Sequence, residues 1–140
     1  DLRGYATALK EKTSAPGEFL VAAVTRQAQR LEKFYGVHVE MKTDISPRLK
    51  SRLAAEAFQI IAEGLSNILR HTRAKLARVS ILCNNSDLVL NIANEARNGA
   101  RGAADFIPRS INERTQALGG RTLVERGADG YTVVHVTIPL

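Results

Sequence analysis

The sequence predicts an α+β fold, a two-layer α/β sandwich in which about three helices cover one face of a mixed sheet. Two observations support this prediction. Segments with apolar residues at helical spacing alternate along the 140-residue chain with segments in which every second residue is apolar. Their order is helix, strand, helix, strand, strand, helix, strand, strand, which favours helices gathered on one side of a mixed sheet. The length suits one domain with a single core.

The first elements follow a turn cluster at Ser14–Gly17. We expect residues 1–13 to be the end of a preceding helix or a linker, and residues 14–140 to form the domain. Apolar residues at helical spacing predict a helix over Glu18–Phe34, which Gly36 ends. Alternation over Val37–Met41 then predicts a half-buried strand.

A second, longer helix is predicted to start at Asp44, Ser46 and Pro47 and to run to His71, because Pro is favoured in a first helical turn. The remaining pattern predicts a hairpin, a polar loop, a third helix closed by a double glycine, and two final strands. Their expected ranges are 79–83 and 88–92 for the hairpin, 94–106 for the loop, 108–118 for the helix, and 122–126 and 132–139 for the strands.

Composition restricts the classes of function. The net charge is +6, but the basic residues are scattered and aromatics do not alternate with them, so we expect no nucleic-acid partner. The single cysteine, Cys83, lies in an alternating apolar run and is expected to be a core thiol. No long apolar span or leader is visible, so we expect a cytoplasmic domain without direct membrane contact.

Polar side chains form a row on the second helix. Gln59, Glu63, Asn67 and His71 are four residues apart, and each step drifts only ~40° around the helix. A carboxylate, an amide and an imidazole in a row can orient water, bind a hard cation and contact phosphate oxygens. An ordinary solvated helix face has the same spacing, and spacing alone favours that interpretation.

Four segments resemble the catalytic domain of two-component sensor histidine kinases. Glu63–His71 (EGLSNILRH) resembles the family's N box, and Glu113–Gly120 (ERTQALGG) resembles its Glu-Arg helix ending in a double glycine. Thr132–Leu140 resembles the last strand, and Asp1–Lys10 resembles the segment that leaves the phosphoacceptor helices. The resemblance implies the ATP-binding fold shared by gyrase, the Hsp90 chaperone, the MutL repair protein and histidine kinases.

The resemblance implies ATP and Mg²⁺ as cofactors and assigns roles to individual residues. Asn67 would hold the Mg²⁺ ion, and Glu63 would be the catalytic residue that orients groups near the γ-phosphate. Arg70 and His71 would contact the phosphates. Thr132 is the surviving half of the family's Gly-Thr pair, since Tyr131 replaces its glycine.

The glycine boxes depart from the family pattern. Asn94 stands where the family has the aspartate that binds the adenine amino group, and Ala96 replaces the glycine that follows. Gly99 and Gly102 are the glycines that would substitute if the loop shifts. The second box, Gly-x-x-Gly, becomes Ile107 and Ser110, with Pro108 between them, and a proline removes a backbone donor for phosphate.

Two main hypotheses follow. In the first, the chain is an ATP-binding catalytic domain that donates the γ-phosphate to a histidine on a separate dimerisation domain, at the cytoplasmic end of a sensor that serves a response regulator indirectly. In the second, the altered glycine boxes have made it a degenerate domain that binds ATP weakly and acts through protein contacts. A third, nucleic-acid binding through the basic surface, is weaker. The first hypothesis also predicts a flexible nucleotide lid over residues 95–106.

Overall fold

The computed structural model describes residues 15–96 and 108–140. Within them the helices are α2 (Pro16–Tyr35), α3 (Ser51–His71) and α4 (Arg109–Ala117). The strands are β1 (His38–Asp44), β2 (Leu76–Cys83), β3 (Asp87–Glu95), β4 (Arg121–Arg126) and β5 (Tyr131–Pro139). The strands form one sheet in the order β1-β2-β3-β5-β4. Only β1 and β2 pair in parallel, so the sheet is mixed, as predicted.

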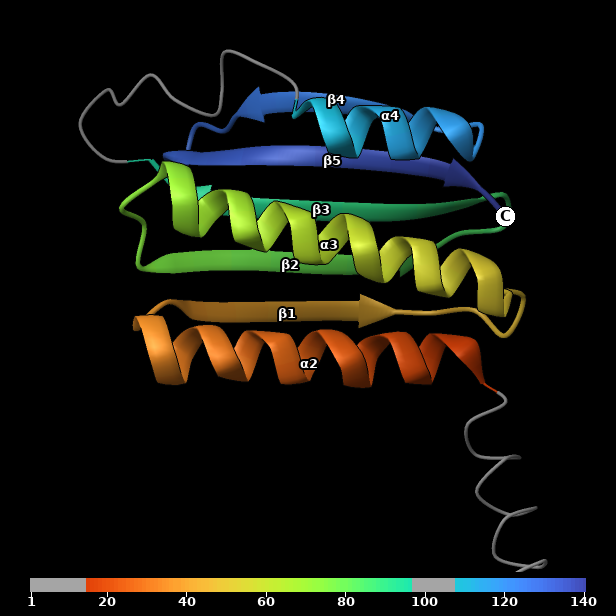
Figure 1. The fold of residues 1–140 in the computed structure, drawn as a ribbon. Helices are drawn as coiled ribbons and strands as arrows, with labels where there is room; N and C mark the ends of the chain where they lie inside the picture. The colour runs from red at the N-terminus through yellow and green to blue at the C-terminus, as the bar shows by residue number, and fades with distance from the viewer. Residues whose placement is uncertain (1–14, 97–107) are drawn as a thin grey trace, which may run out of the picture.

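The three helices cover one face of this sheet (Figure 1). The core lies between the two layers, where alternate residues of β2, β3 and β5 meet the buried faces of α2 and α3. Leu65 of α3, Leu90 of β3 and Val136 of β5 are fully buried there. The predicted α+β sandwich is therefore confirmed.

The predicted start of the second helix is wrong. The structure places it at Ser51 and ends β1 at Asp44, with a turn between them. Ser46 uses its polar groups inside this turn: its Oγ accepts from the Arg48 N–H at 3.1 Å and its carbonyl accepts from the Leu49 N–H at 3.1 Å. Leu49 is 1% exposed, so the turn also contributes to the core.

The polar loop predicted from residue 94 begins later. Asn94 and Glu95 belong to β3, where Asn94 pairs with Ala77 on one side and Thr132 on the other. Glu95 Oε1 accepts from the Lys75 N–H at 3.0 Å. Residues 97–107, which include most of the predicted lid, lie outside the described part of the chain.

The turn between β4 and β5 supports the end of β3. Its Gly130 carbonyl accepts from the Ala96 N–H at 2.7 Å. Arg78 of β2 holds the same turn, since it donates to Asp129 at 3.1 Å and stacks on the Tyr131 ring at 3.8 Å. The backbone N–H of Tyr131, helped by Arg78, lowers the pKa of the Asp129 carboxyl below its ordinary value.

The face of the sheet away from the helices carries a polar chain across four strands. Asn91 donates to Ser80 Oγ at 3.4 Å and its Oδ1 contacts His135 Nδ1 at 2.5 Å. His135 Nε2 lies 3.7 Å from a Glu125 carboxylate oxygen. These contacts link β2, β3, β5 and β4 on the face opposite the helices.

Candidate functional site

The candidate site forms where α3 crosses β3. Gly64 makes this close approach possible, because a Cβ atom there would lie 2.7 Å from Ile92 Cδ1. The last two turns of α3 therefore lie against the end of β3, and α4 packs beside them. Sequence reasoning missed Gly64, although a glycine inside a helical pattern is a signal of close packing.

A small cavity at this crossing brings together three of the predicted site residues. Asn67 and His71 reach it from α3, and Asn94 reaches it from β3. Pro108 and Ile111, at the start of α4, line the same cavity. Its volume is about 30 Å³, which is the space of one water molecule. Asn94 is thus far from Asn67 and His71 along the chain but lines the same cavity, and all three were predicted as site residues from the sequence.

Asn94 is only 6% exposed, so its amide needs hydrogen-bond partners. Its Nδ2 donates to the Glu95 carbonyl at 2.9 Å. No described residue donates to Oδ1, which leaves an acceptor for a ligand. Thr132, directly opposite Asn94 in the strand register, is 3% exposed. Asn94 therefore gives the cavity a polar wall within the sheet, and Thr132 lies beside it on the neighbouring strand.

Asn67 is also joined to Glu63 through Arg70. One guanidinium nitrogen of Arg70 donates to Asn67 Oδ1 at 2.9 Å and lies 3.5 Å from Glu63 Oε1. The amide and carboxylate oxygens thus converge on one positively charged group. Such oxygens are also the donors that Mg²⁺ prefers, and in this structure the Arg70 guanidinium lies between them.

The start of α4 fills the side of the site where the family has its second glycine box. Pro108 is buried, its side chain caps no N–H of the helix, and Ile111 is 1% exposed. Ser110 is exposed, and Ile107 lies outside the described residues. Arg114 ties α4 to α3 through Glu56 at 3.2 Å. This edge therefore presents the apolar side chains of Pro108 and Ile111 to the cavity, and Pro108 has no backbone N–H to donate.

The predicted polar row does not stay together along its whole length. Gln59 lines a different groove, between α2 and α3, because three steps of ~40° place it ~120° away from His71 around the helix. Gly99 and Gly102 lie outside the described residues. Asn67 and His71 are the members of the row that line the cavity, and Glu63 is linked to Asn67 through Arg70.

Among residues 15–96 and 108–140, no helix is long and apolar enough to cross a membrane. The same residues contain no group of three His, Cys, Asp or Glu side chains that could hold a metal ion. A cation at Asn67 would therefore need further oxygens from a bound ligand.

Comparison with known sequences points to sensor kinases. The chain is 29% identical over 144 residues to the nitrate/nitrite sensor protein NarX of Escherichia coli and 22% identical over 126 residues to the oxygen sensor histidine kinase NreB of Staphylococcus carnosus. The aligned regions cover 97% and 86% of this chain but only 23% and 36% of those proteins. The chain thus spans about a quarter to a third of the length of these two relatives. No family model matches the sequence.

Solved structures give the same result for the fold. The histidine kinase domain of a blue-light activated kinase from Erythrobacter litoralis has a TM-score of 0.67 at 17% identity, over 90% of this chain and 61% of that one. The Acinetobacter baumannii histidine kinase AdeS also has a TM-score of 0.67, at 15% identity, over 87% and 64%. The ATP-binding domain of PrrB from Mycobacterium tuberculosis has a TM-score of 0.57 at 15% identity, over 84% and 91%.

The fold class is that of the histidine-kinase ATP-binding domain. Together with the sequence relatives, these likenesses confirm the predicted resemblance to the catalytic domain of sensor histidine kinases.

Proposed function

We propose that this chain is the ATP-binding catalytic domain of a sensor histidine kinase and donates the γ-phosphate of ATP to a histidine on a separate dimerisation domain. The observation that carries the proposal is the convergence of Asn67, His71 and Asn94 on one cavity, with Glu63 and Arg70 beside it. These residues come from α3 and β3, and they are the positions to which the resemblance assigns contacts with the nucleotide and its metal ion.

Each residue has a chemical role in the proposal. Asn94 Oδ1 accepts a hydrogen bond from the adenine amino group, and the nearby Thr132 supports that end of the site. Arg70 and His71 neutralise phosphate charge, which is the main contribution of a protein to phosphoryl transfer. Asn67 supplies an oxygen to Mg²⁺, which when bound neutralises charge on the phosphates. Glu63 is the catalytic carboxylate that orients groups at the γ-phosphate.

Nucleotide binding requires the site to open. The cavity of about 30 Å³ is far smaller than a nucleotide. Pro108 and Ile111 form its wall on the α4 side, so we expect this end of α4 to move outward when ATP binds. The partners of the activity are a phosphoacceptor domain and, through it, a response regulator, in the cytoplasm.

The wall that Pro108 and Ile111 form on the α4 side of the cavity favours one alternative function. Because Pro108 lacks a backbone donor and Ile111 presents an apolar side chain, the start of α4 is poorly suited to phosphate. A poor fit to phosphate is expected of a domain that no longer binds ATP well and acts instead as a protein-interaction or regulatory module. A direct measurement of ATP binding distinguishes the two functions.

The test is calorimetric titration of the full chain with a non-hydrolysable ATP analogue and Mg²⁺. We expect binding that Asn67→Ala weakens, since an interaction with a charged group contributes about 1.5–3 kcal/mol. That loss corresponds to a roughly ten- to hundredfold weaker affinity. Gln59→Ala, two turns earlier on the same helix and outside the cavity, is the matched control and should bind like the wild type. No heat from a folded sample at high ligand concentration would support the interaction module instead.

A further inference from the structure

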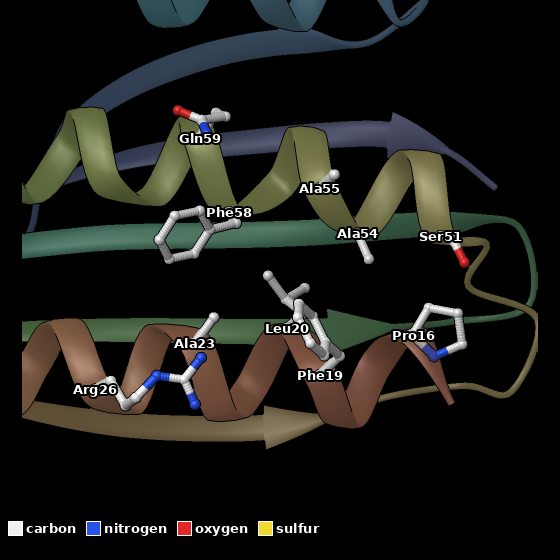
Figure 2. A pocket seen from close by; sticks show the side chains of 10 residues that line it. All are labelled: Pro16, Phe19, Leu20, Ala23, Arg26, Ser51, Ala54, Ala55, Phe58 and Gln59. Atoms are coloured by element: carbon white, nitrogen blue, oxygen red, sulfur yellow. The ribbon is translucent and has the colours of Figure 1, made fainter. Parts of the chain in front are cut away.

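An apolar groove of about 600 Å³ lies between the first turns of α2 and α3. Figure 2 shows Phe19 and Leu20 of α2 on one side of it and Ala54 and Phe58 of α3 on the other. The groove shares no lining residue with the cavity at the crossing of α3 and β3. Its volume is in the range of sites that hold small organic ligands, so it has the size of a second, separate binding site.

The surface of the groove suits a compact apolar body. Phe19 is 57% exposed, and Phe58, on the α3 side, is half-buried. Ala23 and Ala54 contribute only methyl groups to the space between the two helices. Two phenyl rings beside small side chains offer apolar area against which an aromatic or aliphatic group can pack.

The charge that lines the groove has one sign. Arg26 is the one charged residue in the lining, which contains no carboxylate. Figure 2 shows its guanidinium directed toward Ala23, along the groove. Arg26 is exposed and has no hydrogen bond or ion pair with another described residue. A guanidinium in this state can bind an anionic group through charge-assisted hydrogen bonds at the edge of the apolar surface.

The direction of the helices adds positive character at the other end of the groove. Both helices begin there, at Pro16 and Ser51, and neither has a side-chain cap on its first N–H groups. The first turn of a helix carries partial positive charge. Glu18 offsets this charge in α2, but the first turn of α3 contains no acidic residue. The groove as a whole therefore favours a negatively charged ligand.

We propose that this groove is a second ligand site, for a small amphipathic anion with a compact apolar body and one carboxylate or equivalent head group. The apolar body packs on Phe19 and Phe58, and the head group binds the Arg26 guanidinium. The ligand contacts α3 at the end opposite Asn67, and its binding does not depend on the nucleotide site.

The experiment is a titration of the ¹⁵N-labelled full chain with naphthaleneacetate, followed by amide chemical shifts. Naphthaleneethanol keeps the aromatic body without the charge, and acetate keeps the charge without the body. We expect saturable shifts at Phe19, Ala23 and Phe58 with naphthaleneacetate, weaker binding of the alcohol, and no saturation with acetate. These residues lie outside the nucleotide cavity, so failure of this proposal and failure of the proposed function are distinguishable.

Two pairs of variants separate the charge from the apolar surface. Arg26→Gln should weaken naphthaleneacetate roughly fivefold, the effect of one exposed ion pair, and leave the alcohol unchanged. Arg73→Gln, which removes an exposed cation just beyond the far end of α3, should change neither. Phe19→Ala should weaken both probes, whereas Phe34→Ala, a ring of 64% exposure at the other end of α2, should weaken neither.

Four results would overturn the proposal. They are the absence of saturable shifts in the groove, equal affinity for the acid and the alcohol, equal effects of the two arginine variants, and equal effects of the two phenylalanine variants.

Discussion

Arg70 lies between Asn67 and Glu63, beside the oxygen that the proposed function assigns to Mg²⁺. Its guanidinium is bonded to the Asn67 oxygen at 2.9 Å, so a cation and Arg70 compete for one acceptor. A nucleotide offers Arg70 an alternative partner in its phosphates. Metal and nucleotide binding should therefore be coupled through this side chain, with each one favouring the other.

The competition predicts an effect of Arg70→Met on metal binding in the absence of nucleotide. The variant should bind Mn²⁺, measured by electron paramagnetic resonance, more tightly than the wild type. Exposed pairs contribute about 1 kcal/mol or less, so the gain should be roughly fivefold at most. Arg73→Met removes the same charge just beyond the helix, from a side chain that is exposed and makes no ion pair with a described residue. An equal gain in both variants would show a general charge effect and contradict the competition.

At the scale of elements, two glycines set how closely the helices approach the sheet. A Cβ on Gly64 of α3 would meet the end of the flexible Ile92 side chain at 2.7 Å. A Cβ on Gly120, between α4 and β4, would meet the backbone oxygen of Thr137 at 2.3 Å. A side-chain end can move aside, but the carbonyl of a central strand cannot. The two positions should therefore respond differently to substitution.

Urea unfolding of alanine variants checks this difference. Gly64→Ala should cost about 1 kcal/mol, since overpacking outweighs the gain in helix propensity. Ile92→Val removes the clashing methyl group and should abolish that cost. Gly120→Ala should cost about 3 kcal/mol, and Thr115→Ser, which removes a methyl group that the new Cβ would meet at 3.0 Å, should not restore stability. Rescue of Gly120→Ala by that trimming would refute the backbone clash.

For the individual elements, the sequence predicted which segments are helices and which are strands, but it did not predict all of their ends. Strand and helix identities followed from periodicity because one face of each element is buried. The start of α3 was wrong because Ser46 and Pro47 look like a helix cap, yet Ser46 satisfies a local turn. Asn94 was placed in a loop because it is polar, whereas strand pairing and a bond to the Glu95 carbonyl allow its burial.

For the candidate site, sequence spacing predicted neighbours only over short distances. Asn67 and His71 share one cavity because a single step of four residues drifts little around the helix. Gln59 is separated from them by accumulated rotation. The contribution of Pro108 and Ile111 depends on tertiary packing between α4 and α3. Periodicity within one element carries no information about that contact.

At the scale of the whole molecule, the sheet, α3 and α4 meet around the small cavity to which the proposed function assigns ATP. The sheet and α3 hold Asn94 and Asn67 on a rigid base, whereas α4 closes the cavity from the side. Our account therefore requires the start of α4 to move when the ligand binds.

The most direct measurement is a titration of the ¹⁵N-labelled chain with an ATP analogue and Mg²⁺, followed by amide chemical shifts. The account predicts that the largest shifts fall on His71, Asn94 and Ile111, with little change at residues such as Ala23 and Phe58 that line the α2–α3 groove. Absence of shifts at saturating ligand, or shifts centred on the groove, would contradict a nucleotide site at the crossing of α3 and β3.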